Sequence, residues 1–157
     1  MGADLYVKDL PRKKQYRGFE VSQDAVNAGY FRDCYNSSGL FVWLSKNTDM
    51  EFSWWQILDK HDDWFRQDTD DGCMMSVAGA KKFLKMLKLA EKQFVVRKKF
   101  YKVAESKMVS TLDEMKFEDR LEEQTKKETL EYFKWFGLLL QLVETAIKRK
   151  SEIIWSV

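Results

Sequence analysis

Residues that interrupt helices are scarce in this chain. Its 157 residues include one proline and seven glycines, whereas Phe, Tyr and Trp together make up 15%. Proline and glycine are the residues that most disfavour a helix interior, and aromatic side chains bury large areas when elements pack. The composition therefore predicts long, uninterrupted helices around an aromatic core.

Two long helices are predicted in the second half of the chain. Apolar residues recur with the helical period after Ser76 and lysines fill the opposite side, which predicts a helix over residues 76–92. A final helix is predicted over residues 117–150, and its stretch 132–143 is apolar on nearly every side. The residues that we expect to be buried together there are Trp135, Phe136, Leu139, Leu140 and Val143.

The first half of the chain gives shorter signals. Residues 22–36 are interpreted as a capped helix, or as a loop followed by a helix. Ser53 is a candidate N-cap for a short helix over residues 54–60. Residues 62–72 are polar and acidic, which indicates an exposed loop.

The two ends of the chain are β-prone. Residues 3–8 alternate briefly between apolar and polar side chains, and residues 152–157 are rich in residues that favour strands. Two short strands survive only by pairing and by packing on something else, so we expect the ends to pair with each other. The predicted fold class is mainly α. It is a single-domain helical bundle over residues 1–157, to which this small terminal β pairing adds an α+β element.

Charge and hydropathy restrict the class of protein. The formal net charge is +2, and every purely apolar run, such as residues 136–140, is far shorter than the ~18 residues of a transmembrane helix. The N-terminus has no basic-then-apolar signal region. We therefore expect a cytoplasmic protein that makes no membrane contact, with Cys34 and Cys73 as free thiols in a reducing compartment.

No residue pattern points to catalysis or to a metal site. The sole histidine, His61, stands among carboxylates, but residues 67–72 fail the EF-hand pattern because Gln67 and Thr69 fall where acidic ligands are required. There is no Gly-x-Ser-x-Gly elbow and no glycine-rich phosphate loop. We expect no catalytic residue, metal or cofactor, and we prefer a solvated acidic loop to a metal site at residues 62–72.

Basic residues are concentrated in one block. Residues 81–102 contain nine basic side chains and one acidic one, interleaved with aromatics, and such a block can neutralise phosphates while its rings stack on bases. The near-neutral total charge lacks the usual basic excess, so the solvated face of an amphipathic helix is preferred. The residues of the nucleic-acid alternative are Lys92, Arg97, Lys98, Lys99 and Lys102.

The most distinctive polar segment spans residues 30–36, where four hydrogen-bonding side chains occupy five positions. Arg32 can clamp a carboxylate or phosphate, or it can form a buried pair with Asp33 while Asn36 turns the chain. Two tryptophans at 54 and 55 can supply the aromatic wall of a recognition groove. The candidate binding residues are Arg32, Asp33, Tyr35, Asn36, Trp54 and Trp55.

The same segments carry a resemblance to known proteins. The strings MGADLY at 1–6, GYFRDxYN at 29–36, SWW at 53–55 and SxxGA at 76–80, where x is any residue, resemble a family of small uncharacterised proteins from bacteria and their phages. This chain departs from the family in a shorter segment before Gly29 and a longer acidic insertion before Ser76. The resemblance implies a cytoplasmic accessory protein carried by a phage or mobile element, with residues 30–36 as its signature, and it implies no particular activity.

The expected function is non-catalytic binding of a macromolecule. A protein is the preferred partner. The most specific form of this hypothesis is a phage or mobile-element inhibitor of a host defence protein. One alternative is a small-ligand or nucleotide-binding protein, or an enzyme, that uses residues 30–36. Another alternative is nucleic-acid binding through the basic face of residues 81–102.

Overall fold

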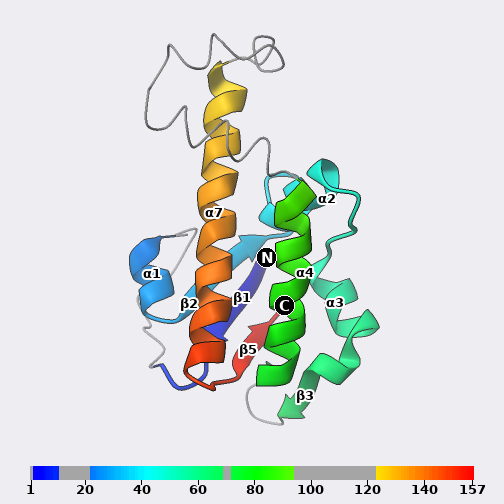
Figure 1. Cartoon of the computed structure of the whole chain (residues 1–157), viewed down its shortest axis with the longest axis vertical. Coiled ribbons are helices and arrows are strands. Elements are labelled where there is room, and N and C mark those ends of the chain that lie inside the picture. Colours follow the sequence, from blue (N-terminus) through cyan, green and yellow to red (C-terminus); the bar gives the residue numbers. More distant parts are fainter. Residues whose placement is uncertain (1, 11–21, 69–71, 94–122) are drawn as a thin grey trace.

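A computed structural model describes residues 2–10, 22–68, 72–93 and 123–157 (Figure 1). Within these ranges, five antiparallel strands form one sheet in the order β2-β1-β5-β4-β3. The strands are β1 (Gly2–Val7), β2 (Tyr30–Cys34), β3 (Phe65–Asp68), β4 (Gly72–Met75) and β5 (Ile153–Ser156).

Helices cover one face of this sheet. The two long helices lie side by side across it, and the shorter ones flank them (Figure 1). The helices are α1 (Gln23–Asn27), α2 (Leu40–Asn47), α3 (Trp54–Lys60), the 3-10 turn η1 (Asp62–Trp64), α4 (Val77–Gln93) and α7 (Glu123–Lys148).

The predicted fold class is wrong. The chain is not a mainly α-helical bundle, because a five-stranded antiparallel sheet forms the floor of an α+β fold. Two errors produced the wrong class. Residues 30–34, interpreted as part of a helix, form β2, and the expected loop at 62–72 contains η1, β3 and the start of β4.

The expected pairing of the two chain ends is confirmed. β1 and β5 run antiparallel with Val7 opposite Ile153 and Leu5 opposite Trp155. These two strands occupy the middle of the sheet, because β2 pairs with the other side of β1 and β4 with the other side of β5. The pairing is therefore the centre of the sheet and not a small addition to a bundle.

Local capping signals predicted several helices correctly. The Ser53 hydroxyl accepts a hydrogen bond from the Gln56 amide at the start of α3, and the Ser76 hydroxyl accepts one from the Gly79 amide at the start of α4. α7 ends at Lys148, close to the predicted end, and the predicted residues 117–122 lie outside the described ranges. Such caps satisfy amide donors that a helix leaves unpaired.

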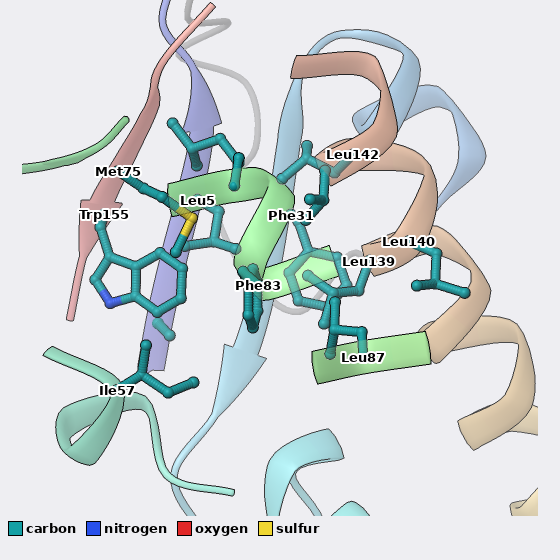
Figure 2. Packing of buried hydrophobic residues seen from close by; sticks show 14 of the residues in the cluster. Leu5, Phe31, Ile57, Met75, Phe83, Leu87, Leu139, Leu140, Leu142 and Trp155 are labelled. Carbon is teal, nitrogen blue, oxygen red and sulfur yellow. The ribbon is translucent and has the colours of Figure 1, made fainter. Parts of the chain in front are cut away.

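The core lies between the sheet and the two long helices. Leu5 of β1 and Phe31 of β2 meet Phe83 of α4 and Leu139 of α7 in one buried cluster (Figure 2). Four of the five residues predicted to be buried on α7 are at most 8% exposed, which confirms them. Trp135 is the exception, since it is only half-buried at the edge of the cluster.

The other face of the sheet carries a charged bridge. Arg66 of β3 donates two hydrogen bonds of 2.6 Å to the Glu152 carboxylate, which precedes β5, and Lys8 lies 3.6 Å from the same carboxylate. Because β4 separates β3 from β5, the Arg66 side chain crosses over β4 on the face where Met74 is buried. Glu152 thus links three strands that are not consecutive in sequence.

Truncation of Leu139 should test the position of the core. Leu139 is fully buried, so Leu139→Ala should lower the free energy of unfolding by ~2–5 kcal/mol through lost burial and the cavity left behind. Leu89→Ala is the matched control, because Leu89 is 47% exposed on α4 and should change stability by ~0.5 kcal/mol or less. Urea denaturation measures both, and equal effects would mean that the helix faces are misassigned.

The Glu152 bridge should make stability depend on pH on the acid side. Hydrogen bonding to Arg66 holds the pKa of Glu152 below its ordinary value of 4.5. A carboxyl whose folded-state pKa is depressed stabilises the fold above its unfolded pKa, and loses this contribution as the pH falls through its folded pKa. The melting temperature of Glu152→Gln should therefore be lower than that of the unmodified protein at pH 7, and the two should converge in acid. A constant difference at every pH would contradict the bridge.

Candidate functional site

Asp33 is the polar centre of the region that the sequence singled out. Its carboxylate is fully buried and accepts hydrogen bonds from the amides of Cys34 (2.8 Å), Leu40 (2.7 Å) and Phe41 (3.1 Å). The Trp54 indole nitrogen donates a fourth bond of 2.6 Å. Burial raises the pKa of the Asp33 carboxyl, while the four donors act in the opposite direction. The carboxylate is therefore a structural acceptor that a ligand does not reach.

Asp33 also supplies the cap that α2 lacks. The N-cap residue of α2 is Gly39, which has no side chain to accept a hydrogen bond. A Cβ at this position would lie 2.0 Å from the Cys34 carbonyl oxygen, so only glycine fits. The carboxylate of Asp33 accepts from the first two amides of the helix instead, where negative charge is favoured by the helix dipole.

Trp54 and Trp55 have opposite environments. Trp54 is 2% exposed and stacks on Phe41 with ring centroids 3.6 Å apart, so it belongs to the core and not to the wall of a groove. Trp55 is 53% exposed, and its ring lies 6.1 Å from that of Tyr35. Of the two tryptophans, Trp55 is the one that a partner can contact.

Arg32 and Asp33 do not form the pair that was one interpretation of the sequence. Consecutive strand residues point to opposite faces, and the register places Arg32 beside Asp4 on the face opposite the core. Arg32 lies 3.7 Å from the Asp4 carboxylate, which also accepts a 2.7 Å hydrogen bond from the Tyr30 hydroxyl. Burial and Asp4 together raise the pKa of Tyr30. Arg32 is thus separated from Asp33 by the sheet itself.

Asn36 organises the turn that follows β2. Its side-chain oxygen accepts hydrogen bonds from the Cys34 thiol (3.1 Å) and from the amide and hydroxyl of Ser38. The Asn36 carbonyl accepts from the Gly39 amide at 2.9 Å. Asn36, Ser37 and Ser38 are all exposed. The turn therefore presents polar groups to solvent while its own contacts fix its shape.

Aromatic side chains frame this turn on both sides. Tyr35 and Trp55 lie at one end. At the other end the Tyr132 hydroxyl of α7 donates a 2.8 Å hydrogen bond to the Ser38 carbonyl, and its ring stacks on Trp43 of α2 with centroids 5.2 Å apart. We name this area the turn surface; its residues are Tyr35, Asn36, Ser37, Ser38, Trp43, Trp55 and Tyr132.

The sequence analysis missed four members of this surface: Ser37, Ser38, Trp43 and Tyr132. Trp43 and Tyr132 stand in apolar runs, 40–44 and 132–143, and both are only half-buried. No spacing in the sequence relates Trp43 to Tyr132. The turn is followed directly by α2 but contacts α7, which lies far away in the chain. Their side-by-side placement follows from the packing of α2 against α7.

A groove runs along α7 next to this region. It has a volume of about 640 Å³ and contains none of the six candidate binding residues. Trp135, which lines it, donates a 3.1 Å hydrogen bond from its indole nitrogen to the Arg32 carbonyl. The lining residues are Ser22, Gln23, Glu131, Lys134, Trp135, Gly137, Leu138 and Gln141.

The structure describes most residues of the metal alternative but only one residue of the nucleic-acid alternative. Within the described ranges no group of three His, Cys, Asp or Glu side chains is placed to hold a metal ion, and His61 stacks on Trp64 with centroids 3.8 Å apart. Cys34 and Cys73 are free thiols, as predicted. Lys92 is exposed on α4. The other residues of the nucleic-acid alternative, Arg97, Lys98, Lys99 and Lys102, lie outside the described residues.

The chain was also compared with known proteins. Protein-family models, curated proteins and solved structures gave no match. Among the described residues, no helix combines the length and the apolar content that crossing a bilayer requires. The geometry of the site is therefore the basis for the function.

Removal of the Asp33 carboxylate should be far more costly than removal of the Asn36 amide. Asp33→Ala leaves four donors of buried hydrogen bonds without their acceptor and should lower the free energy of unfolding by about 3 kcal/mol or more. Asn36→Ala removes contacts of an exposed turn and should cost about 1 kcal/mol or less.

Asp33→Asn provides a second test of the same contact. Its amide keeps one acceptor oxygen but turns an N–H toward donors, so its stability should fall between those of the unmodified protein and Asp33→Ala. Urea denaturation of all three variants measures the order. Equal stability of Asp33→Ala and Asn36→Ala would show that the carboxylate does not hold these elements together.

Proposed function

We propose that the protein is a non-catalytic binding module whose partner is another protein, and that the turn surface is the contact site. One observation carries the proposal. Three exposed polar residues, 36–38, are framed by aromatic side chains, of which Trp55 is 53% exposed. Tryptophan is enriched among the residues that dominate protein interfaces, and a fixed polar turn beside it offers hydrogen-bonding groups to a partner.

The composition of the turn surface supports a protein partner. Tyrosine and tryptophan supply large contact areas with few rotatable bonds, and serine and asparagine supply adaptable hydrogen bonds. Aromatic residues are enriched in protein interfaces relative to the rest of a protein surface. Tyr35, Trp55 and Tyr132 provide the first kind of contact, and residues 36–38 provide the second.

The rigidity of the turn supports the same proposal. Asn36 fixes the turn from within, Tyr132 fixes it from α7, and Asp33 fixes its junction with α2. A surface that is ordered before binding loses less conformational entropy when a partner docks. The hydrogen bonds that immobilise the turn therefore contribute to affinity without touching the partner.

The small-ligand alternative has less support. It needed Asp33 as a polar group in an open pocket, and that carboxylate is fully buried and directed at donors of the fold itself. Trp54, the other expected wall residue, is buried against Phe41. Of the residues left for recognition, Asn36 and Trp55 are exposed and Tyr35 is half-buried. Such an open arrangement suits a macromolecule better than an enclosed ligand.

The resemblance to a family of small proteins from bacteria and their phages supports a more specific proposal about the kind of protein partner. Within the class of protein-binding modules, we propose an inhibitor of a host defence protein as the specific version. Occupation of a partner's surface requires no catalytic residues, and a rigid contact surface on a small fold is sufficient for it.

Replacement of Trp55 should remove partner binding without affecting the fold. Tagged protein is used to capture partners from host lysate, and captured proteins are identified by mass spectrometry. Trp55→Ala should reduce recovery of the partner at least tenfold, because an aromatic anchor at the centre of an interface contributes about 2 kcal/mol or more. Leu89→Ala is the matched control, since Leu89 is the other large hydrophobic side chain that is exposed in the described residues.

Two outcomes would contradict the proposal. If Trp55→Ala and Leu89→Ala recover the partner equally well, with melting temperatures unchanged, the contact site is elsewhere. If the purified protein instead retains a small molecule that Trp55→Ala loses, the small-ligand alternative replaces the protein partner.

A further inference from the structure

Helix α4 presents a line of lysines to solvent. Lys81, Lys85, Lys88 and Lys92 follow one another at intervals of four, three and four residues, and all four are exposed. These intervals place them on one helix face, along ~16 Å of the axis at 1.5 Å per residue. We call these four residues the lysine stripe.

The packing of α4 fixes the direction in which the stripe points. Ala80, Phe83, Leu87 and Ala90 form the opposite side of the helix and are fully buried against the rest of the core. The helix therefore cannot turn its lysines inward without exposing that apolar side. The stripe is therefore a permanent feature of the surface, on the side of α4 opposite its buried residues.

Carboxylates neutralise the stripe only in part. Lys88 lies 3.5 Å from Glu144 of α7, and both side chains are about half exposed at 49%. Lys82, beside the stripe, pairs with Asp63 at 3.0 Å. For Lys81, Lys85 and Lys92, the part of the chain that the structure describes places no carboxylate within ion-pair distance. Exposed ion pairs are weak, so Lys88 can exchange Glu144 for another anion.

We infer that the lysine stripe binds the phosphate backbone of nucleic acid without regard to base sequence. Lysine is depleted in protein interfaces, whereas phosphate contacts are made by such point charges and are strengthened by release of the counterions condensed on the polyanion. The stripe offers charge along a line and no side chain that reads base edges. It is separate from the turn surface, so the inference stands or falls independently of the proposed protein partner.

The test is the salt dependence of binding to a mixed-sequence DNA duplex, followed by fluorescence anisotropy. With three phosphates neutralised, the dissociation constant should rise roughly 40-fold between about 50 and about 200 mM salt. The triple variant Lys81→Gln, Lys85→Gln, Lys92→Gln should lose at least tenfold in affinity at the lower salt concentration. The triple arginine variant at the same positions should retain binding, because it keeps the charge.

A charge-matched control separates the stripe from general attraction. The triple variant Lys46→Gln, Lys60→Gln, Lys148→Gln removes three exposed lysines elsewhere and changes the net charge by the same amount. It should bind DNA within about twofold of the unmodified protein if the stripe is the site. Equal losses in the two glutamine variants would overturn the inference.

Two further results would also overturn it. One is the absence of DNA binding at the lower salt concentration. The other is tighter binding to poly-glutamate than to the duplex, which would identify an acidic protein surface as the ligand of the stripe. Circular dichroism and melting temperatures show whether each variant is folded. If a glutamine variant does not fold, the arginine variant still tests the inference, because it should keep the charge and the binding.

Discussion

A single buried carboxylate holds one end of this fold together. Asp33 stands on β2, accepts the first two amides of α2 and the indole N–H of Trp54 in α3, and so joins three elements at one point. A buried acceptor of this kind must be fully satisfied, because an unmatched polar group in a core is costly. The positions of β2, α2 and α3 therefore depend on one another through Asp33.

This constraint explains why the turn after β2 is a defined surface. Gly39 is forced by the nearby Cys34 carbonyl, so α2 cannot cap itself and depends on Asp33. The turn between Asp33 and Gly39 is held at both ends, and hydrogen bonds to Asn36 hold it from within. The Asp33 cap of α2 thus fixes the turn beside which the exposed aromatic side chains lie.

The sequence predicted features that depend on short-range signals. Serine caps fixed the starts of α3 and α4, and terminal β-propensity correctly indicated that the ends pair. β2 was missed because four of its five residues are buried, so Tyr30, Phe31 and Cys34 show no alternation with polar residues. β3 and β4 were missed because they form a short hairpin at the edge of the sheet, where polar side chains such as Arg66 are tolerated.

The candidate site was predicted only in part for a related reason. Adjacent residues of a helix point about 100° apart, so Trp54 and Trp55 could not share an environment, and only the packing decides which is buried. Asp33 is structural, and three of the four partners of its carboxylate lie seven, eight and 21 positions away. No local pattern encodes such contacts.

The central position of β1 and β5 has a consequence for how the chain acquires its structure. The hairpin of β3 and β4 can form as soon as both strands leave the ribosome. β1 is synthesised before β5 and gains this central neighbour only when β5 has emerged. Until then one edge of β1 is open, and an open strand edge is a template for the wrong partner.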